Sequence, residues 1–475
     1  MRDLTTGNIR KSVWSMAIPL ITASFVQMAY NITDMIWLGH LGSEAVAAVG
    51  VAGFFAWLCN GIALTTKVGA EVTISQSLGA GKKILAKVYA NQAATLSAIM
   101  ALVYAMFLFI SAPGLVAFFR LEANVSEMAT QYMRIVSLGI FCNFNNNTFS
   151  GLYNGQGNSK TPLKIVTIGL VFNMILDPIL IYGLGPIPGL KTAGAAIATS
   201  LAQIIVYLIF VRKLFIQKSA LGKLHFLTHP RGIFIGRIAK LGVPVSAQSA
   251  IFSMFSMTLG SMAATWGHTG VAVQSIGAQI EAITWMTASG LSTALASFVG
   301  QNYGARDYAR IRKGYQYTMK LALGISGFAT VMFLLFGREL FGVFVQDAAT
   351  LDAGHDYMII LALSQVFVAI ENVTAGAFNG CGRTTPPALV GILLTAMRLP
   401  LAMALMHIPA LGLNGIWISI TFSSISKGIV LWMWYLIFRK RLESGKDHGI
   451  RKGIYKPGKI LGKMYSVASR LWQQH

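Results

Sequence analysis

The chain has 475 residues, of which 55% are hydrophobic and only 11% are charged, and its mean hydropathy is +0.61. Soluble proteins carry about 25% charged residues, so this composition excludes an ordinary soluble domain and indicates an integral membrane protein. The three cysteines and eight histidines are scattered along the chain. We therefore expect no disulfide framework, no metal cluster and no cofactor.

Apolar stretches of helical length predict twelve membrane-spanning helices. The first stretch is too long for the apolar region of a cleavable signal peptide. In chain order, the approximate ranges of the predicted spans are 12–37, 45–66, 88–111, 127–152, 162–184, 193–211, 241–262, 274–300, 320–337, 356–380, 388–406 and 413–438.

The basic residues are distributed unevenly over the loops between these spans. Lys and Arg gather on one side of the membrane, and only Arg120, Lys191 and Arg338 fall on the other. Because cytoplasmic loops carry the excess of basic residues, both termini are predicted to be cytoplasmic. The formal net charge of +22 is then a topology signal and favours contacts with anionic membrane lipids. We do not expect nucleic acid as a partner.

The first predicted helix carries a polar stripe. Ser24, Gln27, Asn31 and Asp34 follow one another at spacings of three, four and three, which places them on one face of the helix. Pro19 precedes this stripe and lacks a backbone donor, so it is a predicted hinge.

The fifth predicted helix contains a second polar group. Asn173 and Asp177 lie four residues apart, on one face, and Pro178 follows directly as a second predicted hinge. An ionisable group inside a span is costly and indicates a functional site by default. In the sixth span, Thr199 adds a hydroxyl oxygen. The alternative interpretation is a structural carboxylate held by a buried hydrogen bond.

An internal repeat organises the chain. Pro19 recurs as Pro244. The Gln-x-x-Gly-Ala motif at Gln76 recurs at Gln301, and the offset along the chain is the same as that between the two prolines. The Asn-Gly-x-Gly turn that starts at Asn154 recurs at Asn379, again with that offset. Six spans separate equivalent positions, which predicts two six-helix bundles of the same orientation, related by a pseudo-two-fold axis along the membrane normal.

This repeat predicts four parts of the chain. They are an N-terminal six-helix lobe (1–215), a cytoplasmic linker (216–240), a C-terminal six-helix lobe (241–440) and a basic cytoplasmic tail (441–475). In the tail, apolar residues recur at helical spacing among basic ones. This pattern predicts an amphipathic helix on the membrane surface, with a disordered tail as the alternative.

The second half does not repeat the carboxylates of the first. Its first helix has Gln248 and no acidic residue like Asp34, and Arg398 occupies the repeat position that corresponds to Asn173. Glu281 and Glu371 lie in the eighth and tenth spans. One hypothesis is that Arg398 pairs with one of these glutamates as a structural pair, since a lone buried cation would be expensive. The other is that these groups line a substrate cavity.

The sequence offers no support for an enzyme. The two Asn-Gly-x-Gly turns lack the strand before and the helix after that a nucleotide site requires. No nucleophile–base set is apparent either. We therefore interpret these glycines as tight turns between helices.

Several motifs taken together resemble one family. They are the Pro19 helix, Asn31-x-x-Asp34 followed by Leu38-Gly39-His40-Leu41-Gly42, Gln76-x-x-Gly79-Ala80, the paired Asn-Gly-x-Gly turns ending in Pro162 and Pro387, and Asn173-x-x-x-Asp177-Pro178. With these motifs, the chain resembles the multidrug and toxic compound extrusion (MATE) transporters over nearly its whole length. The resemblance implies a twelve-helix fold with a central cavity. It also implies export of cationic or amphiphilic organic compounds in exchange for protons or sodium.

The resemblance also implies an ion site. In one branch of the family, an aspartate of the first helix and an Asn–Asp pair of the fifth form it, and Asp34, Asn173 and Asp177 match that pattern. Gln27 also matches this branch, and Thr199 is a weaker match. Some members have an acidic residue in the seventh helix. Gln248 stands in that region here, which departs from the pattern of a cation site in the C-terminal half.

The expectation is therefore a monomeric, multi-pass transporter of the plasma (inner) membrane whose coupling ion is a proton or sodium. Two carboxylates in a partly dry pocket repel each other, and a bound ion or an organic cation would compete to relieve that repulsion. Two alternatives stay open. One is a flippase of lipids or lipid-linked oligosaccharides from the same superfamily, and the other is a membrane-embedded enzyme. A channel is disfavoured because a two-bundle repeat suits alternating access.

Overall fold

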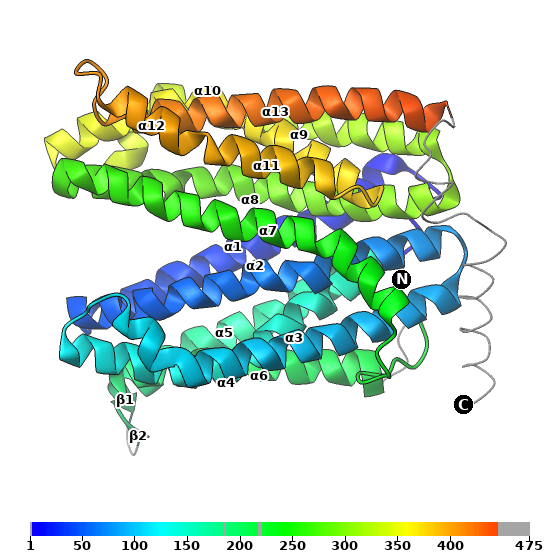
Figure 1. Ribbon diagram of the computed structural model, residues 1–475, viewed down its shortest axis with the longest axis horizontal. Helices are drawn as coiled ribbons and strands as arrows, with labels where there is room; N and C mark the ends of the chain where they lie inside the picture. The colour runs from blue at the N-terminus through cyan, green and yellow to red at the C-terminus, as the bar shows by residue number, and fades with distance from the viewer. Residues whose placement is uncertain (1, 185–186, 217–220, 445–475) are drawn as a thin grey trace. The chain divides into compact units, whose positions relative to one another are not determined.

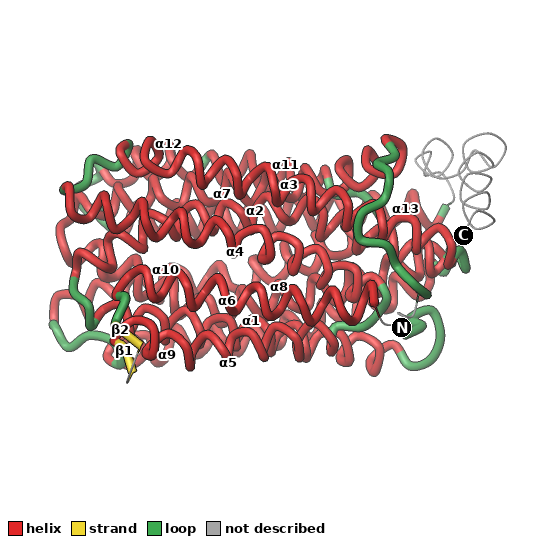
Figure 2. Tube along the Cα trace, turned by 90° about the horizontal axis from the view of Figure 1, so that it is seen from below, coloured by secondary structure: helices red, strands yellow, loops and turns green. Residues whose placement is uncertain are grey.

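The computed structural model describes residues 2–184, 187–216 and 221–444. Figure 2 shows that these residues are almost entirely helical, with one short hairpin of β1 (Gly183–Leu184) and β2 (Ile187–Pro188) paired antiparallel. The helices are α1 (Ile9–Gly39), α2 (Ser43–Gly79), α3 (Lys83–Ala117), α4 (Ala123–Gly155), α5 (Lys160–Tyr182), α6 (Lys191–Val211), α7 (Gly232–Ala263), α8 (Gly267–Ala305), α9 (Tyr308–Gly342), α10 (Ala348–Gly380), α11 (Thr385–Ala396), α12 (Arg398–Met406) and α13 (Asn414–Glu443). The predicted amphipathic helix of the tail lies outside the described residues.

Ten helical stretches of the described chain are long and apolar enough to cross a membrane. One of them, Gly232–Ala305, contains both α7 and α8, and another, Thr385–Met406, contains α11 and α12. The asparagine-rich α4 is not among the ten, although its 33 residues are amply long. With α4 included and α7 separated from α8, the described helices account for the twelve predicted spans.

Most of these helices are longer than the predicted spans. Helix α8 has 39 residues, which at 1.5 Å per residue is about 58 Å, whereas the hydrocarbon core is about 30 Å thick. Hydropathy detects only the part of a helix inside the bilayer, so the helical ends were missed. Helix α7 accordingly begins at Gly232, within the stretch predicted as linker.

The chain divides into two compact units. Unit 1 comprises Ile18–Leu78 and Lys82–Ser246, and unit 2 comprises Asp3–Ala17, Gly79–Gly81 and the described chain from Ala247 onward. The first helix of each half is therefore shared. Helix α1 passes from unit 2 to unit 1 next to Pro19, and α7 passes from unit 1 to unit 2 next to Pro244.

Unit 1 is held together by close helix packing. Helix α4 packs against α3 and α6, and α5 packs against α6 (Figure 1). Small residues allow this approach: a Cβ added to Gly139 of α4 would lie 2.8 Å from the Cα of Ser200 in α6. Such contacts between small residues are the usual basis of helix association in membranes, where burial of apolar surface contributes little. They fix α5 and α6 beside α4.

Unit 2 has an aromatic core and a helix that is broken into α11 and α12. The rings of Tyr357 in α10 and Trp417 in α13 meet edge to face, with centroids 5.1 Å apart. Both α11 and α12 pack on α13 (Figure 1). Helix α11 ends at Ala396, four residues before Pro400, because a proline ring clashes with the carbonyl four residues earlier and offers no N–H to it. Arg398 is the first residue of α12.

Candidate functional site

The first candidate site lies in unit 1, where α1 carries Asp34 and α5 carries Asn173 and Asp177. Asn173 Nδ2 donates a hydrogen bond of 2.8 Å to Asp177 Oδ1, as the four-residue spacing allows. Asn173 is 1% exposed and Asp177 is fully buried. The carboxyl groups of Asp34 and Asp177 lie within hydrogen-bonding reach of each other. The two carboxylates that were predicted from the sequence on separate helices, Asp34 and Asp177, therefore lie next to each other.

Each of these three residues has an oxygen atom without a partner. Among the described residues, Asp34 Oδ1, Asn173 Oδ1 and Asp177 Oδ2 are buried and accept no hydrogen bond. Buried oxygens are normally satisfied, and an exception calls for a bound group or a proton. Carboxylate and amide oxygens are the ligands that hard cations prefer. These three oxygens are therefore available to a proton or to a hard cation.

Hydroxyl groups border the two carboxylates. The hydroxyls of Tyr30 in α1 and Thr199 in α6 lie 3.5 Å apart. Tyr132 of α4 also reaches Thr199, and both tyrosines interact electrostatically with Asp34 and Asp177. Thr199 was predicted from the sequence, whereas the tyrosines were missed. The available signal for Tyr30 was its position, four residues before Asp34 and on the same helical face.

Two further residues of the predicted stripe lie apart from the carboxylates. Gln27 Nε2 donates to Asn31 Oδ1 at 3.1 Å, and Asn31 is exposed in unit 1. Neither residue makes a hydrogen bond to Asp34 in the described part of the chain. The two predicted hinges, Pro19 and Pro178, lie inside continuous helices, α1 and α5.

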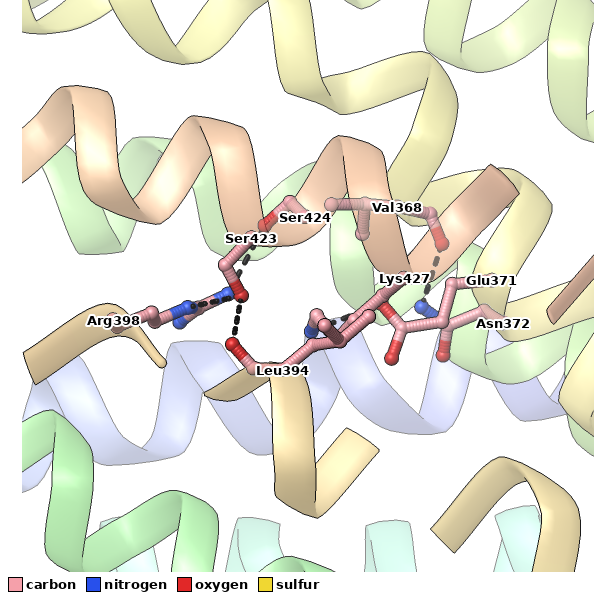
Figure 3. Close-up of polar contacts among 8 residues, drawn as sticks. All are labelled: Val368, Glu371, Asn372, Leu394, Arg398, Ser423, Ser424 and Lys427. Atoms are coloured by element: carbon pink, nitrogen blue, oxygen red, sulfur yellow. Dashed lines mark hydrogen bonds and ion pairs between the residues drawn. The ribbon is translucent and has the colours of Figure 1, made fainter. Parts of the chain in front are cut away.

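A second polar cluster lies in unit 2 and contains both signs of charge. Figure 3 shows Lys427 of α13 directed at Glu371 of α10, and the Lys427 Nζ to Glu371 Oε2 distance is 3.0 Å. Arg398 donates from Nε to Ser423 Oγ and from Nη2 to Ser424 Oγ, each at 3.0 Å. Both cationic side chains are buried, and Arg398 is 6% exposed.

These contacts bear on the hypothesis that Arg398 pairs with a glutamate: Glu371 and Glu281 both act on its charge electrostatically, without a direct contact in the described chain. Arg398 forms no ion pair with Glu371 or Glu281 among the described residues, and Glu371 pairs with Lys427 instead. Serine hydroxyls on α13 accept the hydrogen bonds of the guanidinium, because Arg398 lies beside α13, at the break between α11 and α12. Lys427 was not predicted, although a lysine in the middle of the last apolar span was a visible signal.

The other two predicted residues of this half have different surroundings. Glu281 Oε1 is buried without a hydrogen-bond partner among the described residues, and Arg398 acts on Glu281 electrostatically without bonding it. Gln248 of α7 packs its amide against Gly391 of α11, where a Cβ would collide with it. In the described chain, no group of three or more His, Cys, Asp or Glu residues could hold a metal ion.

Comparison with known proteins places this chain. The MatE family model matches residues 19–179 and again 244–404, about two thirds of the chain. The second match begins at Pro244, which is the predicted repeat partner of Pro19 at the start of the first match. The fold class is thus confirmed: an all-α membrane protein made of two six-helix halves. The chain belongs to the MATE family of transporters, which are not enzymes.

Relatives and solved structures agree with this assignment. The chain is 25% identical to the "Probable multidrug resistance protein NorM" of Thermotoga maritima, with 90% of this chain and 92% of that protein covered. It is 23% identical to the "FAD transporter" of Shewanella oneidensis, with coverage of 90% and 94%. A crystal structure of MATE in complex with MaL6 matches with a TM-score of 0.87 at 26% identity, covering 93% of this chain and 99% of that one.

Proposed function

We propose that this transporter exports cationic or amphiphilic organic compounds across the plasma (inner) membrane by antiport with protons or sodium, through alternating access. It acts as a monomer with both termini in the cytoplasm. The multidrug resistance name of the Thermotoga maritima relative supports the class of compound. The excess of Lys and Arg in the loops of one side supports the orientation.

One observation carries the coupling mechanism: the buried contact between the carboxyl groups of Asp34 and Asp177. Two negative charges within hydrogen-bonding reach of each other repel strongly in a site that excludes water. One proton or one sodium ion relieves the repulsion, and so does the charge of an organic cation. Occupation by the ion and by the substrate would then be mutually exclusive, which is the requirement for exchange.

The surrounding residues have distinct roles in this mechanism. Asn173 orients Asp177 through its amide hydrogen bond, and its free carbonyl oxygen can join the carboxylates around a cation. Thr199 adds a hydroxyl oxygen beside the pair. Gln27 and Asn31 precede Asp34 on α1 and would contact the substrate, and bending at Pro19 and Pro178 would link the ion state to the helix shape.

The ion gradient supplies the work of export. A gradient of one pH unit provides about 1.4 kcal/mol per proton, and one charge moved across 100 mV provides about 2.3 kcal/mol. Sealed vesicles with either a pH gradient or a sodium gradient would identify the ion. The effective gradient must accelerate export, and its collapse must stop it.

The test of the site is a pair of isosteric substitutions. Asp34→Asn and Asp177→Asn should each lower gradient-driven export at least tenfold while the melting temperature stays near that of the unchanged protein. Asp352→Asn is the matched control, because Asp352 is an exposed carboxylate in an ion pair with Arg338. Full export by either folded variant would remove that residue from the coupling site, and full export by both would refute the mechanism.

A second candidate function is transport of an anionic amphiphile. If that amphiphile is a lipid or a lipid-linked oligosaccharide, the protein is a flippase. The specific support is the similarity to the FAD transporter of Shewanella oneidensis, together with the buried cations Arg398 and Lys427. Each of these cations already has partners, which is why we rank this candidate second. Gradient-driven movement of FAD, with none of an organic cation, would reverse the ranking.

A further inference from the structure

Arg134 of α4 is an unpaired cation on an outward face of unit 1. It lies inside the predicted span 127–152, and its side chain is exposed. Its guanidinium carbon lies 6.0 Å from the ring centroid of Phe109 in α3. Among the described residues, the guanidinium donates no hydrogen bond and forms no ion pair. An unpaired charge within a span is costly, so this position calls for a partner.

The face that carries Arg134 differs from the asparagine-bearing face of α4. Asn143 follows Arg134 by nine residues, about two and a half helical turns, and therefore lies on the opposite side of the helix. Glu127, Gln131 and Arg134 follow one another at spacings of four and three, and all three are exposed. They form one polar stripe that runs from the first turns of α4 to Arg134.

Beyond Arg134, toward the middle of α4, the surface becomes apolar. Leu138 lies one turn further along the helix and is 64% exposed. Helix α3 packs beside α4 (Figure 1) and runs in the opposite direction, because only residues 118–122 join the two. On α3, Phe109, Met106 and Leu102 share a face and are 47%, 53% and 53% exposed. This surface therefore has a polar end and an apolar end, as a phospholipid has.

The depth of Arg134 matches that of a lipid headgroup. Helix α4 has 33 residues, or about 50 Å, and exceeds the hydrocarbon core of about 30 Å by about 20 Å. With equal lengths outside the core on both sides, the Cα of Arg134, about 17 Å from the start of α4, lies about 7 Å inside the core. Helical side chains lean toward the N-terminus, and a long arginine side chain reaches the interface from this depth.

We propose that Arg134, Phe109 and Glu127 form a binding site for phosphatidylethanolamine, a zwitterionic phospholipid, from the leaflet next to the connection between α3 and α4. The guanidinium binds the phosphate through charge-assisted hydrogen bonds, and its position over the Phe109 ring fixes its orientation. Glu127 lies two turns closer to the start of α4, where it attracts the ammonium group of the lipid. One acyl chain lies along Leu138 and the exposed face of α3. This inference goes beyond the proposed export and does not depend on the transported compound.

Three lipids with the same acyl chains separate the contributions of the headgroup. Phosphatidylethanolamine carries a phosphate and an ammonium group, phosphatidylglycerol carries the phosphate alone, and diacylglycerol carries neither. Native mass spectrometry of the purified full-length chain would measure the retention of each lipid. The variants are Arg134→Met, which keeps an apolar stem, and Glu127→Gln. Arg120→Met is the matched control, because Arg120 is an exposed cation in the connection between α3 and α4.

The expected result depends on the headgroup. Arg134→Met should retain both phospholipids at least fivefold more weakly, while the retention of diacylglycerol should change less than twofold. Glu127→Gln should weaken phosphatidylethanolamine two- to threefold and strengthen phosphatidylglycerol, because it removes an attraction for the ammonium group and a repulsion of the anionic headgroup. Arg120→Met should change each lipid less than twofold. In lipid-free detergent, every variant should melt near the temperature of the unchanged protein, since all three side chains are exposed.

Four other outcomes would overturn the lipid site. Unchanged retention of phosphatidylethanolamine by Arg134→Met would remove the arginine from it. Equal retention of diacylglycerol and phosphatidylethanolamine by the unchanged protein would mean that the surface binds acyl chains alone. Tighter retention of phosphatidylglycerol than of phosphatidylethanolamine would refute the zwitterionic headgroup. A dimer that Arg134→Met dissociates would make this face an interface between two copies of the chain. Each of these results leaves the proposed export standing, because the vesicle assay tests export separately.

Discussion

The two halves of the molecule hold different groups at equivalent positions. In unit 1, α5 carries Asn173 and Asp177, and the repeat places Arg398 and Ala402 at the corresponding positions of unit 2. The amide of Asn173 supports a carboxylate that meets a second carboxylate. The guanidinium of Arg398 rests on two serine hydroxyls. The same repeat position is therefore Asn173, beside two carboxylates, in unit 1 and Arg398, a fixed positive charge, in unit 2.

This difference teaches how the charges are balanced. Two glutamates of unit 2 have cations built into the protein, since Glu371 pairs with Lys427 and Arg398 acts on Glu281. The aspartates of unit 1 have no basic partner among the described residues. In the proposed mechanism, their compensating charge comes from a bound proton or cation. We infer that unit 1 exchanges ions while the cluster of unit 2 stays charge-balanced throughout.

The largest effect is expected when unit 1 is given the residue of unit 2. Asn173→Arg would place a permanent cation beside Asp177 and Asp34 and occupy the position of the exchangeable ion. Gradient-driven export should fall to background, and the vesicle assay described above measures it. The paired control is Asn173→Gln, which keeps an amide. If Asn173→Arg is folded by its melting curve and still exports with the gradient, the two units do not differ in the way we infer.

The next effect concerns the fixed balance of unit 2. Lys427→Met should lower the free energy of unfolding by about 3–5 kcal/mol, because it leaves the buried carboxylate of Glu371 without its cation. Thermal unfolding of the purified protein would show this loss. The double variant Lys427→Met/Glu371→Gln should regain much of the stability. Removal of the exposed pair through Arg338→Met should cost at most about 1 kcal/mol. Equal losses at both pairs would contradict a charge-balanced core.

A third comparison involves the segments that precede α1 and α7. Arg310 of α9 donates to the carbonyl oxygens of Leu4, Thr6 and Gly7, at 3.1, 2.7 and 2.9 Å, so the segment before α1 is fastened to unit 2. Its repeat counterpart before α7 is fastened to unit 1, where Gln92 bonds the backbone of residues 229 and 231. Each unit thus holds the chain that leads into the other unit's first helix.

Loss of either fastening should loosen only its own segment. Arg310→Ala should raise amide hydrogen exchange in residues 4–10, with a local cost of about 1–3 kcal/mol, and should leave residues 225–235 unchanged. Gln92→Ala should do the reverse. Arg312→Ala serves as the control on α9, because its ion pair with Glu443 is long and exposed. Exchange that rises in both segments after either substitution would show that they are not independent.

Much of this arrangement could be predicted from the sequence, for physical reasons. A carboxylate in an apolar helix is conspicuous, so Asp34 and Asp177 could be placed on helices expected to pack together. The internal repeat set the fold class, because six spans separate equivalent positions. The partners of Arg398 could not be predicted, since the choice between Ser423 and a glutamate depends on the helix break at Pro400. Tyr132 was missed because only tertiary packing brings α4 to Thr199.

The smallest effect compares two helix starts that the repeat makes equivalent, Glu122 before α4 and Asp347 before α10. Asp347 accepts hydrogen bonds from the Thr350 amide at 3.0 Å and from its hydroxyl at 2.8 Å, whereas Glu122 makes no capping bond with its side chain. The Thr350 hydroxyl and amide hold the pKa of Asp347 below its usual value. This cap therefore stabilises α10 at pH values above the pKa of an unfolded aspartate, about 3.9. The contribution is lost as the pH falls through the lower folded pKa.

Asp347→Ala should raise hydrogen exchange in the first turn of α10 at neutral pH, and Glu122→Ala should leave α4 unchanged. An equal response of both helices would show that the shorter side chain of Asp347 is not what caps α10.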